Sequence, residues 1–273
     1  MNLTPEQLER YSRHVLLKGV GQNGQKKLLE SAVLCIGTGG LGSAALNYLA
    51  SAGVGRIGIM DGDKVELSNI HRQIIHTMND IGRAKVESAR DRICALNRDV
   101  TVETYSERLT RENAQEIISK YDAVVDCCDN FATRFLTNDA CFFVKRPLFF
   151  GSALRYEGQV TVFFPGRPDE PCYRCLFPEA PPPDFVSTAA EVGILGSVAG
   201  LIGTIQATEC IKYLIGIGTN LNRRLLLYDA WGMTFRPIDV PRNSRCKLCG
   251  DQPTITSLAE STSEKRGAPE QAQ

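Results

Sequence analysis

An apolar run leads directly into a Gly-rich turn in Ala32-Val33-Leu34-Cys35-Ile36-Gly37-Thr38-Gly39-Gly40-Leu41-Gly42. The apolar run predicts a buried strand, and the Gly-x-Gly-x-x-Gly turn predicts a helix start whose N–H groups can bind a phosphate. A second expected strand, residues 56–60, delivers Asp61 about twenty residues after the last glycine, where an acid reaches a ribose hydroxyl. Together these features predict a nucleotide site. The alternative is a Gly-rich turn that binds nothing.

Strand and helix patterns alternate through the first half of the chain. Thr4, Pro5 and Gln7 predict a capped helix start, and one apolar face predicts a helix over residues 84–96. Further strands are expected over residues 100–104, 123–125 and 148–150. In the second half, residues 159–164, 225–228 and 233–240 look like strands joined without intervening helices. The pattern predicts an α/β fold with a doubly wound, mostly parallel, Rossmann-like sheet and an antiparallel C-terminal extension.

The uncharged, Gly-rich segment 192–208 is too short for a membrane span and predicts a buried helix. Its glycines allow close contact with another helix, including one across a subunit interface. We expect one domain over residues 1–250, with a nucleotide-binding half at about 1–151 and a second half at about 152–250. Residues 178–190 and the tail 251–273 are expected to be unstructured or disordered from their composition.

Composition excludes several classes of protein. Lys and Arg number 31 and Asp and Glu number 31, so the balanced charge favours neither nucleic acid nor an anionic membrane as a partner. The N-terminus has no pattern of a signal peptide, which predicts a cytoplasmic protein. The ten cysteines are then expected to stay reduced and to serve as metal ligands, core residues or reactive thiols.

Two Cys-x-x-Cys pairs predict a metal site. Cys172 with Cys175 and Cys246 with Cys249 supply four thiolates, which make a closed, structural zinc site. Such a site would tie the C-terminal part of the chain to a distant loop. A redox dithiol is the alternative, although one pair would suffice for that role.

A set of polar and charged residues has no obvious use in a packed core. Asn69, Arg72 and Gln73 lie in the irregular stretch 62–82, and Lys85 lies in a first helical turn, where the helix dipole disfavours a cation. Asp129 and Asn130 follow the strand 123–125, at the sheet edge where ligands collect, and an acid there can hold Mg²⁺. Each has a structural alternative, such as Asp129 as a helix N-cap. One bound nucleotide would explain all of them.

Several motifs occur in a fixed order from residue 8 to residue 250. They are Gly37-Thr38-Gly39-Gly40-Leu41-Gly42, Asp61-Gly62-Asp63, Leu67-Ser68-Asn69-Ile70-His71-Arg72-Gln73, Lys85-Val86-Glu87-Ser88-Ala89, Asp126-Cys127-Cys128-Asp129-Asn130, Gly158-Gln159-Val160-Thr161-Val162 and the two cysteine pairs. This ordered set closely resembles the MoeB/ThiF/HesA family of adenylyltransferases, bacterial relatives of ubiquitin-activating enzymes, and above all its MoeB-type members in molybdopterin synthesis.

The resemblance implies ATP-dependent adenylation of the C-terminal glycine of a small ubiquitin-like sulfur carrier, on a homodimer with structural zinc. It implies catalytic roles for Arg72, Lys85 and Asp129, and for Arg13, which the neighbouring subunit would supply. Asp129 would also hold Mg²⁺. The candidate nucleotide-binding set, from the motifs and the resemblance together, is Gly37, Gly39, Gly40, Gly42, Asp61, Asn69, Arg72, Gln73, Lys85, Asp129 and Asn130.

One departure from the family concerns sulfur transfer. Some members carry a Thr-Cys pair, used for a covalent link to the carrier, where this chain has Thr188-Ala189. The missing thiol, and the lack of a rhodanese-like extension after Gly250, imply a separate sulfur donor. The carrier is expected to end in a slender Gly-Gly tail and to serve molybdenum cofactor synthesis. A ThiF-like thiamine carrier, an NAD-dependent dehydrogenase, a non-catalytic partner-binding subunit and a tRNA-modifying relative are the alternatives.

Overall fold

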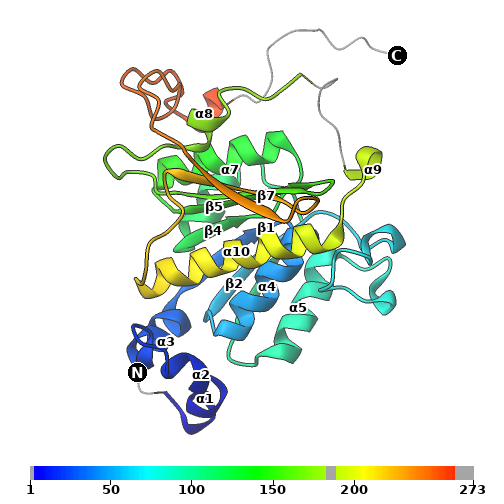
Figure 1. Ribbon diagram of the computed structural model, residues 1–273. Helices are drawn as coiled ribbons and strands as arrows, with labels where there is room; N and C mark the ends of the chain where they lie inside the picture. The colour runs from blue at the N-terminus through cyan, green and yellow to red at the C-terminus, as the bar shows by residue number, and fades with distance from the viewer. Residues whose placement is uncertain (1–2, 183–188, 262–273) are drawn as a thin grey trace.

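The computed structural model describes residues 3–182 and 189–261 (Figure 1). One eight-stranded sheet runs through it in the order β3-β2-β1-β4-β5-β6-β7-β8. Its first five strands are parallel and the last three antiparallel, which confirms the predicted sheet. The strands are β1 Ala32–Ile36, β2 Arg56–Met60, β3 Thr101–Tyr105, β4 Ala123–Asp126, β5 Leu148–Leu154, β6 Glu157–Phe163, β7 Arg224–Asp229 and β8 Thr234–Asp239.

Helices cover both faces of the sheet. One face carries α4, α5 and α10, and the other carries α6 and α7 (Figure 1). The helices of the described chain are α1 Pro5–Arg10, α2 Ser12–Val15, α3 Gly21–Glu30, α4 Gly40–Ala52, α5 Lys85–Leu96, α6 Ala114–Ser119, α7 Phe131–Val144, α8 Tyr173–Leu176, α9 Ala189–Val192 and α10 Gly196–Ile215, with 3-10 turns η1 Leu67–Asn69, η2 Met78–Asp80 and η4 Leu258–Glu260. The capping box of Thr4 and Gln7 is present in α1.

Strand β1 lies in the centre and is buried along its whole length. Because side chains alternate across a strand, Val33 and Cys35 enter the core beneath α4 and α10, and Leu34 enters the core beneath α6 and α7. The two cores sandwich the sheet and hold the strand ends, from which the functional loops start, in fixed positions.

Helix α10 differs from the predicted segment 192–208 in both bounds. Gly193 has a φ of +80°, so the short helix α9 stops there and α10 starts at Gly196. A Cβ at Gly203 would collide with the Leu41 carbonyl oxygen of α4, which confirms the expected close helix contact within the chain. None of the described helices is long and apolar enough to cross a membrane.

Two expectations about organisation need correction. The strands at 159–164 and 225–228 are neighbours in the sheet, but α8, α9 and α10 intervene along the chain. The tail is ordered from residue 251 to Ser261, because Ile255 and Leu258 are buried and Ser261 donates a hydrogen bond to Asp139. Residues 189–190 belong to α9, whereas residues 183–188 and 262–273 lie outside the described part of the chain.

Candidate nucleotide site

The candidate nucleotide site lies at the carboxyl edge of the parallel strands. Strand β1 pairs with β2 on one side and β4 on the other, so the chain order reverses beside β1. The loops that leave these three strands therefore meet at a topological switch point, where doubly wound sheets bind their ligands. They carry the Gly-rich turn, Asp61 and the Asp126–Asn130 segment.

The backbone of the Gly-rich turn requires glycine at some positions but not at position 39. Gly37 has a φ of +93°, and a Cβ at Gly42 would collide with the Gly37 carbonyl oxygen. At Gly39, in contrast, a Cβ would only meet Gln73 Nε2 at 3.8 Å, an ordinary contact. No described neighbour demands a glycine at position 39, so its lack of a side chain leaves room for a ligand beside the N-terminus of α4.

Asp61, directly after β2, stabilises this turn. Its Oδ2 accepts hydrogen bonds from the backbone N–H and the hydroxyl of Thr38, both at 2.8 Å, and its Oδ1 accepts from the Asp63 N–H at 2.9 Å. The carboxylate is thus fixed next to the glycines. Thr38 was not singled out by its sequence position.

Lys85 is a buried cation at the first position of α5. Its ammonium group donates to Asp63 Oδ2 at 3.2 Å, and Arg108 donates to Asp63 Oδ1 at 3.2 Å. Burial raises the pKa of the Asp63 carboxyl, but these two cations outweigh it and hold the pKa below its usual value. Two cations on one carboxylate leave excess positive charge, which suits an anionic ligand.

The loop between β2 and α5 presents the remaining residues in different ways. Asn69 makes a hydrogen bond within the loop, because its Oδ1 accepts from the Glu66 N–H at 3.1 Å and so caps η1. The buried Gln73 has an Oε1 atom with no hydrogen-bond partner among the described residues. Arg72 donates to the Ser68 carbonyl at 2.8 Å, with its Cβ and backbone close to Gly196 at the start of α10.

His76, in the same loop, is buried. Its Nδ1 lies 2.8 Å from the Ser88 hydroxyl, and its Nε2 has no hydrogen-bond partner in the described chain. Burial, with Lys85 nearby, lowers the pKa of the imidazole. The neutral ring is the favoured form, so His76 adds no charge to the site.

The segment after β4 forms a tight turn into α7. Asp126 is buried and accepts the Cys128 N–H at 3.0 Å, and burial raises the pKa of its carboxyl while Arg134 opposes the rise. Asn130, not Asp129, caps α7, because its side chain accepts the Thr133 N–H at 2.9 Å. The N-cap alternative for Asp129 is therefore wrong. Its carboxylate is exposed and accepts no hydrogen bond from the described residues.

Arg13 belongs to α2, which lies at the bottom of Figure 1, away from these loops. Its neighbour Tyr11 contacts Asn97, just beyond the last turn of α5, and Gln25 of α3 donates to Ala52, the last residue of α4. Helix α4 has 13 residues, about 20 Å at 1.5 Å per residue, and the Gly-rich turn is at its other end. The structure therefore does not bring Arg13 to the site of its own chain.

The four cysteines of the two Cys-x-x-Cys pairs come together, as predicted. Their Sγ atoms all lie within 4.8 Å of one another, with Cys172 to Cys246 at 3.6 Å and Cys175 to Cys249 at 3.3 Å. Four sulfurs at about 2.3 Å from a tetrahedral zinc ion are about 3.8 Å apart, so this cluster can hold zinc. The Asn243 N–H lies 3.3 Å from Cys175 Sγ and supports it from outside the set.

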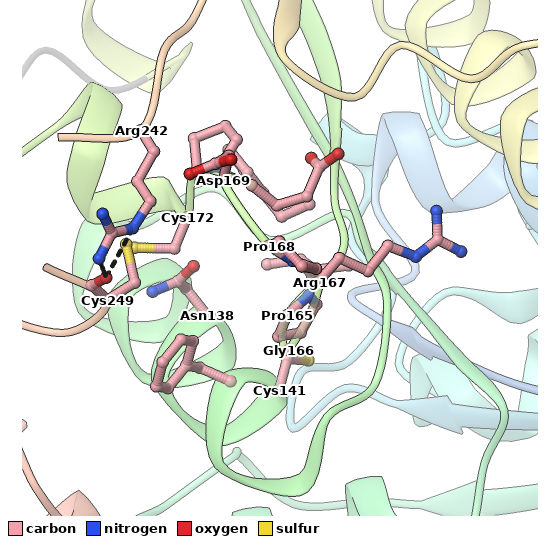
Figure 2. Close-up of a pocket in the computed structure, with 15 residues that line it drawn as sticks. Asn138, Cys141, Pro165, Gly166, Arg167, Pro168, Asp169, Cys172, Arg242 and Cys249 are labelled. Atoms are coloured by element: carbon pink, nitrogen blue, oxygen red, sulfur yellow. Dashed lines mark hydrogen bonds between the residues drawn. The ribbon is translucent and has the colours of Figure 1, made fainter. Parts of the chain in front are cut away.

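A cavity of about 480 Å³, which the sequence did not predict, lies beside this cluster. Figure 2 shows the residues that line it. The loop 165–171 forms one wall, and α7 forms another with Asn138 and Cys141. Arg242 closes it near the cluster and donates to the Cys249 carbonyl at 3.0 and 2.7 Å. None of the candidate nucleotide-binding residues lines this cavity. It is separate from the site at the strand ends.

The chain is similar in sequence and fold to several known proteins. The ThiF family model matches residues 11–248. The sulfur carrier protein adenylyltransferase of Thermus thermophilus is 48% identical over 263 residues, 95% of this chain and 97% of that protein. The SAMP-activating enzyme E1 of Haloferax volcanii is 46% identical, over 92% of both chains. The chain covers only 59% of the adenylyltransferase and sulfurtransferase MOCS3 of Aedes aegypti, at 47% identity. The fold matches E. coli MccB with ATP at a TM-score of 0.75 and 19% identity, covering 88% of this chain and 74% of that one.

Proposed function

The chain belongs to the ThiF family and is an adenylyltransferase, and from that premise we propose that it activates the C-terminal glycine of a small ubiquitin-like sulfur carrier protein with ATP. The observation that carries the proposal is the meeting of the Gly-rich turn, Lys85 and the Asp126–Asn130 segment at one edge of the sheet. These parts come from separate segments and match what a nucleoside triphosphate needs: a helix N-terminus, buried positive charge and a free carboxylate.

The chemistry needs position and charge more than a protein nucleophile. The carrier's carboxylate is already ionised when it attacks the α-phosphorus, and the bond to pyrophosphate breaks as the acyl-adenylate forms. The main obstacles are repulsion between two anions and the charge that develops on pyrophosphate. Lys85 and Arg72 would neutralise that charge, Gly39 would let the phosphates approach the backbone, and Asp61 would keep the turn in place.

Asp129 is our candidate magnesium ligand, because its exposed carboxylate has no hydrogen-bond donor in the described chain. When bound, Mg²⁺ would shield the phosphate oxygens from the incoming carboxylate. Cys172, Cys175, Cys246 and Cys249 would hold zinc in a structural role, since four thiolates leave no open coordination position.

The position of Arg13 supports our proposal of a homodimer. This residue is exposed and lies beyond the far end of α4, so a role at bound phosphates would place it at the site of another subunit. Leu16 and Leu17, close to Arg13 in the chain, are 77% and 55% exposed and offer apolar surface for such an interface. We propose that each subunit lends Arg13 to the phosphates bound by its neighbour.

We propose a carrier that ends in Gly-Gly, because a slender tail can enter a site bounded by the Gly-rich turn and the 62–82 loop. The half after residue 151 would bind the carrier's folded part. The small subunit of molybdopterin synthase is our first choice and a thiamine carrier the alternative, since Ala189 stands where a linking cysteine would be. A separate sulfur donor would then receive the activated carrier.

Pyrophosphate exchange with a panel of purified carriers tests the proposal. Exchange should require ATP, Mg²⁺ and a carrier with an intact C-terminal glycine, and the molybdopterin-type carrier should give the highest kcat/KM. The same carrier without its last glycine is the matched control. Equal exchange with the shortened carrier, or none with any carrier, would contradict the proposed function.

A further inference from the structure

Gln206 is a buried polar side chain in the middle of the apolar helix α10. Its Nε2 donates to the Asp126 carbonyl at 2.7 Å and to the Phe149 carbonyl at 2.9 Å, and its Oε1 accepts from the Cys127 thiol at 3.6 Å. A Cβ at Gly151 would collide with this amide. Gln206 therefore ties the end of β4 to β5 from one face of the sheet.

Arg134 acts on the same turn from the opposite face. It lies in α7, is 8% exposed, and its Nη2 donates to the Cys128 carbonyl at 3.1 Å. Its guanidinium lies over the rings of Phe150 and Phe131, 5.4 and 5.7 Å from their centres. The aromatic rings pack against its long side chain. Burial disfavours the charged guanidinium, but Cys128 and the Asp126 carboxylate nearby outweigh it and raise its pKa.

Two buried side chains thus fix the carbonyl groups on either side of Cys127, directly before Asp129 and Asn130. We infer that Gln206 and Arg134 are positioning residues for binding of MgATP, acting through this turn; the inference rests on the proposed function of the site. Neither residue is proposed to touch the nucleotide. A displacement of about 1 Å at a reacting centre can cost about a hundredfold in rate, so loss of either support should be measurable.

The chain offers a matched control for each residue. Gln25 is as buried as Gln206 and donates to the Ala52 carbonyl at 2.8 Å, but at the far end of α4. Arg174 is as buried as Arg134 and lies over the Phe135 ring, but it pairs with Asp139. Gln206→Met is compared with Gln25→Met, and Arg134→Lys with Arg174→Lys. Each substitution keeps the approximate size of the side chain and alters its hydrogen bonds.

Calorimetric titration with MgATP, without carrier, gives Kd for each purified protein, and thermal unfolding gives Tm. Gln206→Met and Arg134→Lys should raise Kd at least tenfold. Gln25→Met and Arg174→Lys should lower Tm comparably and leave Kd within twofold of wild type. Wild-type Kd in Gln206→Met and Arg134→Lys would overturn the inference. An equal rise of Kd in Gln25→Met and Arg174→Lys would overturn it too.

Exchange kinetics on the same proteins separate this inference from the proposed function. A wild-type protein that binds MgATP but adenylates no carrier contradicts the proposed function, while the Kd comparison still decides the positioning role. A wild-type protein that binds no MgATP overturns both. If Gln206→Met does not fold, Gln206→Glu replaces it: loss of the donating amide should weaken MgATP binding at least tenfold, and wild-type affinity would overturn the role of Gln206.

Discussion

Replacing Arg174 by Met should destabilise the protein strongly, because Arg174 and Asp139 form a fully buried ion pair. The guanidinium donates to the two carboxylate oxygens at 2.8, 3.1 and 2.7 Å, and the side chains are 3% and 0% exposed. Arg174→Met leaves the carboxylate buried without its cation, which costs about 3–5 kcal/mol. For a chain of this length that corresponds to a fall in Tm of roughly 6–20 °C.

The double variant Asp139→Leu/Arg174→Met checks whether the cost comes from the unpaired charge. Removing both charges should cost clearly less than the sum of the two single variants, with a coupling of about 1–3 kcal/mol. Urea unfolding of the wild type, both single variants and the double variant gives the four free energies of unfolding. Lys120→Met, which breaks the exposed pair with Glu116, is the control and should cost less than about 1 kcal/mol.

Additive single-variant costs, or an Arg174→Met cost no larger than that of Lys120→Met, would refute this reasoning. Arg174 lies between two zinc-ligand candidates in the sequence, and Asp139 lies in α7, which begins at the nucleotide site. The pair therefore joins the segment that carries Cys172 and Cys175 to α7.

Cys175→Ser should lower bound zinc from one ion per chain towards none and reduce Tm, as elemental analysis and calorimetry would show; a metal-free wild type purified without chelator would contradict this. Arg72→Ala, Lys85→Ala and Asp129→Ala should each lower carrier-dependent exchange by at least about a hundredfold while the fold survives, and near wild-type rates in all three would refute the site. Burial lowers the pKa of His76, with Lys85 assisting and Asp80 and Asp61 opposing. The unfolded chain therefore binds a proton below about pH 6.5 that the native state resists, so stability falls as pH drops below about 7. His76→Gln should flatten that fall in Tm, and an unchanged pH profile would exclude this role.

Local sequence patterns predicted the sheet well, because the three buried strands β1, β2 and β4 are apolar runs that end at a glycine or an aspartate. The runs ending at Gly37, Asp61 and Asp126 mark the carboxyl edge without any knowledge of distant contacts. The cysteine cluster was predictable for a similar reason. Two Cys-x-x-Cys pairs have few uses in a reduced protein besides binding one metal ion.

Sequence patterns did not predict the long-range hydrogen bonds. Gln206 donates to a carbonyl group 80 residues away in the sequence, and no local pattern indicates that partner. Arg134 is buried, and no local pattern indicates its contact with the Cys128 carbonyl. Residues 251–261 were predicted to be disordered because most of them are polar. Two apolar residues among them, Ile255 and Leu258, become buried only against the folded remainder of the chain. Asp129 and Asn130 are adjacent cap candidates, and only the backbone geometry distinguishes them.

The most direct test of the central claim is intact-mass spectrometry of a Gly-Gly-ended carrier after incubation with the protein, ATP and Mg²⁺, under denaturing and non-reducing conditions. We expect a carrier that has gained one AMP and an enzyme of unchanged mass, with no product when the carrier's last glycine is removed or when Lys85 is replaced by Ala. A carrier that stays unmodified beside an enzyme shown to bind MgATP would contradict adenylation, and a covalent adduct between carrier and enzyme would contradict the separate sulfur donor.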